Sequence, residues 1–213
     1  MFMTKPMEIE ERSMEIIAPH LAGLNLSDDE RKIYSRIIHA SGDVGYAPII
    51  KIHPKAIKAT KAALNRGAII FTDVEMVRHG ISIRTFTKFG GEIFCKVSDV
   101  DVRERAKAEG ITRSMAAMRL FGKRLENQII AIGNAPTALF EVLRLVREEN
   151  IHPAVIIGVP VGFVGAAEAK AQLAAQDVPF ITVAGTKGGS SIAVAIVNAI
   201  LYILDNSRGL NEK

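Results

Sequence analysis

Five short, nearly continuous apolar runs alternate with helix-like segments from residue 68 onward, and this alternation limits the possible folds most. The runs are 68–72 (AIIFT), 91–97 (GEIFCKV), 129–133 (IIAIG), 154–160 (AVIIGVP) and 179–185 (PFITVAG). Strands that are apolar at nearly every position are buried on both faces, which is typical of a parallel sheet between two helical layers. The sequence therefore predicts a three-layer α/β/α fold, with a doubly wound, mainly parallel, five-stranded sheet.

Helical periodicity and turn residues place the helices of this fold. Between and after the runs, helices are expected at 53–66, 73–80, 98–110, 112–125, 135–149, 165–176 and 189–205. Two more helices form an N-terminal segment: Ile9, Ile16 and Ile17 make a helical stripe in the first, and a capping box at Ser27–Glu30 opens the second. No Pro- or Ser-rich linker divides the chain, so residues 1–213 are expected to form a single domain.

Composition excludes several classes of protein. With 48% hydrophobic and 23% charged residues, the chain is ordinary for a soluble globular protein and is not disordered. Its longest apolar run, Ile192–Leu204, falls short of the about 20 residues that span a bilayer. Residues 1–11 show no export signal, and the single cysteine, Cys95, excludes an internal disulfide. We therefore expect a cytoplasmic protein without a membrane partner.

The formal charge of +4 favours anionic partners weakly, which leaves nucleic acid and polyanionic small molecules both open. Glycines and small polar residues cluster where the predicted strands end, which is where doubly wound folds bind ligands. At Gly185–Ser190 (GTKGGS) the spacing differs from that of a phosphate-binding P-loop, because Lys187 precedes the glycine pair. The favoured interpretation is a tight turn that lets a helix pack closely. The alternative is anion binding by free amides, with Lys187 adding charge.

Neither a metal site nor a nucleophilic triad has support in the sequence. The chain has five histidines: His20, His39, His53, His79 and His152. No two of them share the spacing of metal ligands, and no cysteine accompanies Cys95. A G-x-S-x-G elbow is missing as well. No resident metal or cofactor is therefore expected.

His39 is the strongest candidate for catalysis. It lies in the last predicted turn before Gly42, and it shares a helix face with Ser35 and Arg36, which precede it by four and three residues. A helix C-terminus stabilises a protonated imidazole, the form that acts as a general acid. The alternative is a capping histidine that binds the last carbonyl groups of the helix.

Three further residues have both a structural and a ligand-binding interpretation. Ser13 lies within the apolar stripe of the first helix, where a bond to the carbonyl of Ile9 is favoured over a ligand contact. Arg113 opens a helix against its dipole, which suits either a carboxylate ligand or a solvated surface. Asp73 follows a strand, and we expect it to cap the next helix.

Seven segments in order resemble one known family. They are Lys5–Ser13 (KPMEIEERS), Arg36–Asp43 (RIIHASGD), Thr72–Arg78 (TDVEMVR), Thr112–Ser114 with Ala116–Arg119 (TRS, AAMR), Ile132–Leu139 (IGNAPTAL), Gly158–Gly165 (GVPVGFVG) and Lys187–Ser190 (KGGS). The chain resembles the precorrin-8X (cobalt-precorrin-8) methylmutases of cobalamin biosynthesis over nearly its whole length.

The resemblance implies a flavodoxin-like fold, a homodimer and an isomerase that moves a methyl group from C-11 to C-12 of a corrinoid tetrapyrrole. It implies that His39 is the catalytic acid and that Ser13, Ser35, Arg36 and Arg113 line the substrate pocket. Lys187 joins these substrate-binding candidates because the substrate carries a rim of carboxylates. The methyl group moves within one molecule, so no cofactor and no nucleic acid are expected. The competing hypothesis is a module that binds a corrinoid or another polyanion without turnover.

Overall fold

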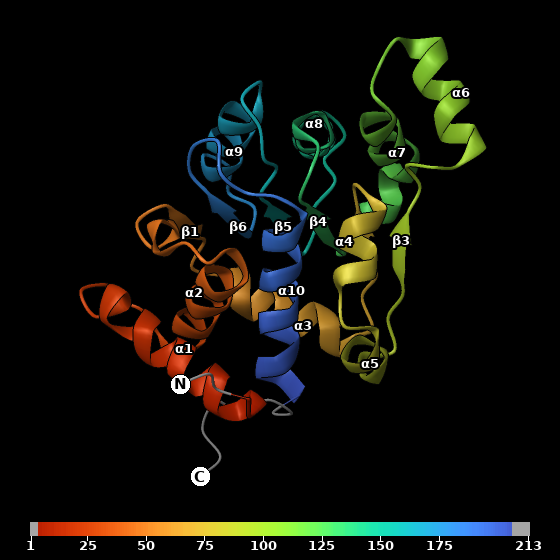
Figure 1. Cartoon of the computed structure of the whole chain (residues 1–213). Helices are drawn as coiled ribbons and strands as arrows, with labels where there is room; N and C mark the ends of the chain where they lie inside the picture. Colours follow the sequence, from red (N-terminus) through yellow and green to blue (C-terminus); the bar gives the residue numbers. More distant parts are fainter. Residues whose placement is uncertain (1–3, 206–213) are drawn as a thin grey trace.

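A six-stranded sheet in the order β1-β6-β5-β4-β2-β3 forms the centre of the computed structural model, which describes residues 4–205 (Figure 1). The strands are β1 (Ile50–Ile52), β2 (Ile70–Thr72), β3 (Ile93–Cys95), β4 (Ile129–Ile132), β5 (Val155–Gly158) and β6 (Phe180–Val183). Neighbours among β2–β6 are parallel, whereas β1 is antiparallel to β6. The predicted count of five strands is therefore wrong, because β1 has only three residues, too few to show a period.

Helices cover both faces of the sheet, as the alternating sequence pattern predicted. They are α1 (Pro6–Leu21), α2 (Asp28–Ser41), α3 (Ala56–Asn65), α4 (Glu75–Gly80), α5 (Ile83–Phe86), α6 (Val100–Glu109), α7 (Arg113–Phe121), α8 (Pro136–Glu148), α9 (Ala166–Ala174) and α10 (Ser190–Asp205). The first five and α10 lie on one face and α6–α9 on the other, so the core consists of two apolar clusters separated by the sheet.

The register of the strands explains why neither face is polar. Phe71, Ile130 and Ile156 lie side by side on β2, β4 and β5 and face the cluster under α6–α9. Residues one position away, such as Ile70 and Ile129, face the opposite cluster. Strands that are buried on both sides take mostly apolar residues, which accounts for the apolar runs in the sequence, and the two buried threonines, Thr72 and Thr182, donate to backbone carbonyls.

Helix α10, blue in Figure 1, crosses the face of the sheet and packs against α2, α3, α4, α5, β4 and β5. Ile192, Ile196 and Ile200 are fully buried or nearly so, and Leu201 on another side of the helix is buried as well. This helix is therefore more deeply buried than a surface helix, and the elements that cover it belong to the same chain. Within residues 4–205, no helix is both long and apolar enough to cross a bilayer.

The strands β2, β4, β5 and β6 end at one edge of the sheet, here called the carboxyl edge. Residues 73–75, 133–137, 159–165 and 184–190 form the turns that lead from these strands to α4, α8, α9 and α10. Because β1 is antiparallel, the segment between α2 and β1, which includes a 3-10 turn at Val44–Tyr46 (η1), reaches the same edge. The C-terminal end of α2 therefore adjoins the turns where ligands bind in doubly wound folds.

Candidate active site

Helix α2 presents His39 at the end of a well-defined helix. The helix begins at the capping box, in which the Ser27 amide donates to Glu30 and the Glu30 amide to Ser27 Oγ. It ends at Gly42, whose φ of 65° is the left-handed conformation that glycine adopts without strain. The buried face of α2 consists of Ile33, Tyr34, Ile37 and Ile38. Ser35 and Arg36 are partly buried on the other face, and His39 is exposed.

The imidazole of His39 has no partner in the part of the chain that the structure describes. The Ile38 carbonyl accepts hydrogen bonds from the Gly42 amide at 2.8 Å and from Ser41 Oγ at 3.1 Å. Among residues 4–205, the imidazole takes part in no hydrogen bond or ion pair, so the capping interpretation of His39 finds no support. An exposed imidazole that the protein does not use is free to meet a ligand.

An ion pair between Asp43 and Lys187 joins the end of α2 to the turn that follows β6. Lys187 Nζ lies 2.5 Å from Asp43 Oδ2, and it sits 5.4 Å from the ring centroid of Tyr46. The hydrogen bond from Lys187, with a second from the Gly45 amide, holds the pKa of the Asp43 carboxyl below its usual range. Asp43 follows His39 by four residues and lies beyond the end of α2, so the ion pair ties the loop after His39 to the turn that follows β6.

Ser13 and Arg36 lie nearby, and both have partners within the chain. Ser13 Oγ donates to the Ile9 carbonyl at 2.7 Å, which is the bond that the sequence favoured. One amino group of Arg36 lies 3.6 Å from a carboxylate oxygen of Glu10, and its guanidinium carbon lies 5.3 Å from the Tyr202 ring centroid. Arg36 thus links α2 to α1 and α10. To bind a substrate carboxylate as well, its guanidinium would have to keep these contacts while it donates to the ligand.

The predicted apolar stripe of α1 is only partly correct. Ile17 and Leu21 are buried against α2, but Ile9 and Ile16 are 43% and 55% exposed. The main contacts of α1 are with α2, so the stripe that faces α2 is the one that is covered best. Ile9, Ser13 and Ile16 therefore share a face of α1 that the rest of residues 4–205 leaves open.

Arg113 lies apart from these residues. It is the first residue of α7, and its exposed guanidinium makes no ion pair within the described part of the chain. Thr112 caps the helix by accepting from the Met115 amide, and its hydroxyl lies 2.7 Å from that of Thr137 at the start of α8. Arg113 is thus at the carboxyl edge, but on a helix that covers the opposite face of the sheet from α2. The structure brings His39, Ser35 and Arg36 together on one helix and does not bring Arg113 to them.

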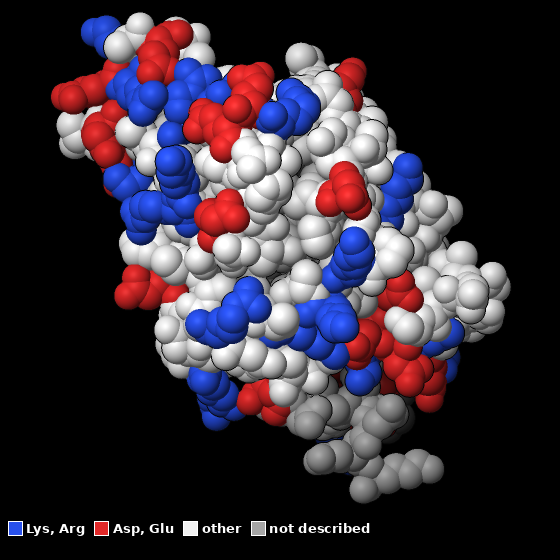
Figure 2. Space-filling view, turned by 180° about the vertical axis from the view of Figure 1, so that it is seen from behind, with Lys and Arg blue, Asp and Glu red and all other residues white. Residues whose placement is uncertain are grey.

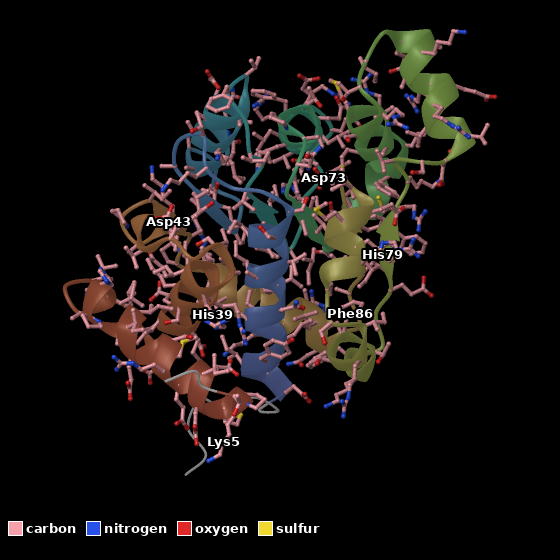
Figure 3. All side chains as sticks on the ribbon, in the orientation of Figure 1. Lys5, His39, Asp43, Asp73, His79 and Phe86 are labelled. Atoms are coloured by element: carbon pink, nitrogen blue, oxygen red, sulfur yellow. The ribbon has the colours of Figure 1, made fainter. Side chains whose placement is uncertain are left out.

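Asp73 fills the turn at the centre of the carboxyl edge. Its fully buried carboxylate accepts hydrogen bonds from the amides of Gly133 at 3.0 Å, Asn134 at 2.8 Å and Ala135 at 2.7 Å. Burial raises the pKa of Asp73, and the three amides partly counter this rise. In Figure 3, His39 and Asp43 lie on the α2 side of α10, whereas Asp73 lies on the other side, near α4 and α8.

The expectation that Asp73 caps the helix after β2 is wrong. Helix α4 starts two residues later, at Glu75, and no side chain caps it. The Asp73 carboxylate points instead to the start of α8, where it accepts from three neighbouring backbone amides. The residue at the N-cap position of α8, Ala135, has no side chain that could cap the helix itself. The sequence does contain one signal for this role: an acidic residue, Asp73, directly follows a buried strand. In the sheet that strand, β2, lies beside β4, and the two strands end at the same edge. The partner loop is 60 residues away in sequence, however, and local patterns cannot identify it.

Of the glycines after β6, Gly188 serves close packing, but against the backbone of the turn after β5 and not against a helix as the favoured interpretation held. A Cβ atom on Gly188 would lie 2.3 Å from the Val159 carbonyl oxygen, so no other residue fits there without movement of the backbone. The Gly189 amide donates to the same oxygen at 2.8 Å. Beneath this turn, the buried Lys170 donates to the Lys187 carbonyl, and burial lowers the pKa of Lys170 to about 8.

A cavity of about 520 Å³ lies at the other end of α2 and is a weaker candidate for the site. Its lining consists of Ser27, Asp29, Glu30, Ile52, Pro54, Ile57, Lys58 and Lys61. Lys61 already pairs with Asp29 at 2.6 Å, and Glu30 belongs to the capping box. The described residues contain no group of three or more His, Cys, Asp or Glu side chains that could hold a metal ion.

Comparison with known proteins decides the family. The family model for precorrin-8X methylmutase matches residues 8–203, which includes every element from α1 to most of α10. The chain belongs to the precorrin-8X methylmutase family. The cobalt-precorrin-8 methylmutase of Priestia megaterium is 43% identical over 202 residues, which are 95% of this chain and 90% of the relative. The precorrin-8X methylmutase of Sinorhizobium sp. is 41% identical, with coverage of 90% and 92%.

Solved structures of this methylmutase family share the fold. The precorrin-8X methylmutase from Thermus thermophilus superimposes with a TM-score of 0.86 at 33% identity, over 93% of this chain and 96% of that one. A precorrin-8X methylmutase-related protein superimposes with a TM-score of 0.83 at 37% identity, over 89% and 99%. The fold described above is therefore shared with members of this family over about nine-tenths of the chain.

Proposed function

We propose that this chain catalyses the methylmutase reaction for which its family is named. The substrate is precorrin-8X or its cobalt-containing counterpart, and the methyl group moves from C-11 to C-12 to give hydrogenobyrinate or cobyrinate. The support is a family match over residues 8–203 and relatives that carry the names of these methylmutases. The enzyme is thus an isomerase of cobalamin biosynthesis. The bond from the methyl carbon to C-11 breaks and that to C-12 forms, so no methyl donor is required.

The exposed imidazole of His39 is the observation that carries the proposed mechanism. It has no partner among residues 4–205 and stands exposed at the C-terminal end of α2. His39 donates a proton to the macrocycle, which withdraws electron density from the migrating centre and eases the shift. The proton returns when the product forms, so the overall reaction is an isomerisation.

The substrate carboxylates are proposed to meet three cations. Lys187 contacts the loop that follows His39, where Asp43 holds it at 2.5 Å, so a substrate carboxylate has to compete with or join that pair. Among the described residues, Arg113 makes no ion pair, so of the three cations it is the most available to a carboxylate. It lies on α7, however, and not on α2. Arg36 would combine its contact to Glu10 with one to substrate. Ser35 would donate a hydrogen bond from α2, and Ser13 would donate one from α1 by giving up its bond to the Ile9 carbonyl.

Three finer features belong to the same proposal. A flavodoxin-like topology is supported by the order β3-β2-β4-β5-β6, since these five parallel strands follow the 2-1-3-4-5 pattern. A homodimer is supported by the open apolar face of α1, with Ile9 and Ile16, but not by α10, whose apolar sides are covered by its own chain. One domain is supported by the single sheet, and a cytoplasmic location by the single cysteine.

The competing hypothesis of a polyanion-binding module receives less support. Figure 2 shows Lys and Arg side chains interspersed with Asp and Glu around α6, rather than a basic surface. Many of these charges are paired, for example Arg105 with Glu109 and Lys96 with Asp101. Nucleic-acid binding depends on unpaired cations that replace counterions, so this face is poorly suited to it.

Single-turnover absorbance on the purified protein tests the proposal. The wild-type protein is expected to convert the substrate, because the methyl shift changes the conjugation of the ring and hence its visible spectrum. His39→Ala is expected to slow this step by about 10²–10⁴-fold, as loss of a general acid does, and to keep product binding within about tenfold. His152→Ala is the control, because His152 is exposed and distant in the fold from α2. Turnover of His39→Ala at the wild-type rate excludes the acid role, and a wild-type protein that binds without turnover favours the binding module.

A further inference from the structure

The turn between β5 and α9 exposes two large apolar side chains next to each other. Phe163 is 95% exposed and Val164 is 89% exposed, and Val161 two residues earlier is 45% exposed. The other large apolar side chains that are exposed in residues 4–205 lie on helices or on η1 and range from 40% to 71%. Scattered apolar residues at surfaces are normal, but adjacent ones with almost no contact to the protein indicate an interaction site.

This apolar tip, residues 161–164, is built on a fixed base. The Val159 amide donates to the Ile132 carbonyl at 2.8 Å, and the Gly162 amide donates to the Thr186 carbonyl at 3.1 Å. Gly162 and Gly165 on either side of the tip have φ angles of 149° and 78°, which other residues rarely adopt. A Cβ atom on Gly165 would contact Phe140 at 3.4 Å and Pro136 at 3.6 Å, so the end of the tip is set against α8. The backbone thus holds the two side chains outward, and their exposure is a consequence of the turn's own geometry.

The tip is also next to a cation of the candidate site. Thr186, which accepts the bond from Gly162, directly precedes Lys187 in the chain. Val161 lies over the start of α10, because a Cβ atom on Gly189 would be 3.9 Å from its side chain. The base of the apolar tip therefore contacts the same turn that carries Lys187 at the carboxyl edge, and the Lys187 ammonium reaches from this turn to Asp43.

We infer that the apolar tip packs against one face of the corrinoid ring while Lys187 faces its rim, so that Phe163 and Val164 are substrate-binding residues. The inference rests on the proposed function. A ring with an apolar face and a border of carboxylates needs both surfaces at once, and this part of the carboxyl edge provides them. A second copy of the chain is a poorer occupant for the tip alone, because an aromatic side chain buries about 150–250 Å², against about 800 Å² per partner in a standard interface.

The test compares Phe163→Ser/Val164→Ser with the wild-type protein in product titrations followed by visible absorbance. Both side chains are exposed, so the variant is expected to fold normally. Product binding is expected to weaken by at least about tenfold, which corresponds to the loss of one buried apolar side chain. Phe163→Leu restores an apolar surface and is expected to keep most of the affinity. Ile83→Ser is the matched control, since Ile83 is 61% exposed on α5.

Two outcomes overturn the inference. One is unchanged product affinity in the double variant, and the other is a fall in its mass by light scattering, which assigns the tip to an interface between chains. Turnover by the wild-type protein is measured in parallel, so that a failure of the proposed methylmutase activity can be distinguished from a failure of the proposed binding role of the apolar tip. A wild-type protein that binds product but does not convert substrate contradicts the proposed function, while the titrations still decide the role of the tip.

Discussion

The buried carboxylate of Asp73 allows a quantitative test of what holds the carboxyl edge together. Replacing Asp73 with Asn leaves the size of the side chain unchanged but exchanges one acceptor oxygen for an NH2 group. In the native protein, one oxygen accepts from Asn134 and Ala135 and the other from Gly133. An asparagine can keep at most one of these two acceptor positions, so at least one amide of the turn faces a donor instead of an acceptor.

The magnitude follows from the number and type of these bonds. A hydrogen bond to a charged group contributes about 1.5–3 kcal/mol, and a buried amide without a partner costs about 1–3 kcal/mol. The neutral side chain is easier to bury, which offsets part of this loss. We expect Asp73→Asn to lower the free energy of unfolding by about 3 kcal/mol, a large part of the about 5–15 kcal/mol of an ordinary domain.

Urea unfolding of the full chain at neutral pH measures this difference. The control is Asp99→Asn, the same substitution at the start of α6, where the side chain makes no capping bond and only a 3.4 Å ion pair with Lys96. That control is expected to stay within about 0.5 kcal/mol of the wild type. If Asp73→Asn stays within the same limit, the amide cluster does not depend on the carboxylate and the reasoning is wrong.

Three further predictions concern charge and assembly. Arg113→Ala is expected to weaken product binding at least about tenfold and to change stability by under about 1 kcal/mol; unchanged affinity in an absorbance titration removes Arg113 from the site. Burial raises the pKa of Glu141, but bonds from Arg119 and Arg144 outweigh it and hold the pKa below the usual range. Its stabilising effect is therefore present above the ordinary glutamate pKa of about 4.3 and is lost as the pH falls through the lower folded value. In urea unfolding at pH 7, Glu141→Gln is expected to lower the free energy of unfolding by about 3–5 kcal/mol, and the difference from wild type should become smaller below about pH 4. A difference that stays constant with pH contradicts the stabilising role of the ionised Glu141. Light scattering at micromolar concentration is expected to give about twice the chain mass of 23.1 kDa, and Ile16→Glu about one chain mass; a wild-type mass near 23.1 kDa excludes a stable dimer.

Local patterns predicted those parts of the fold that local chemistry determines. The capping box at Ser27 and the stop at Gly42 are interactions within a few residues, so the bounds of α2 were close to those observed. The central strands are apolar because both their faces are covered, and this feature is visible in any single strand. The helical spacing of Ser35 and His39 follows from the same periodicity.

Features that depend on distant partners could not be predicted in the same way. The strand β1 exists because Ile50–Ile52 meets the edge of β6, and nothing within those three residues shows it. Asp73 binds a turn that lies 60 residues further along the chain, and Lys187 pairs with Asp43 across 144 residues. The role of α10 shows the same limit: its apolar sides are filled by α2, α3, α4 and α5 of its own chain, which a sequence pattern cannot distinguish from a surface that awaits a partner.

The pairing of β1 with β6 also has a consequence for the folding of the chain while the ribosome makes it. Helix α2 and strand β1 leave the ribosome early, but their partners α10 and β6 are the last elements of the described chain to be made. About 130 residues separate β1 from β6, and at about 5–20 residues per second this interval lasts roughly 6–26 s. During that time α2 can pack against α1, but the larger part of its apolar contacts, those to α10, is still missing. The nascent amino-terminal segment is therefore the part of this protein that most needs a chaperone while translation continues.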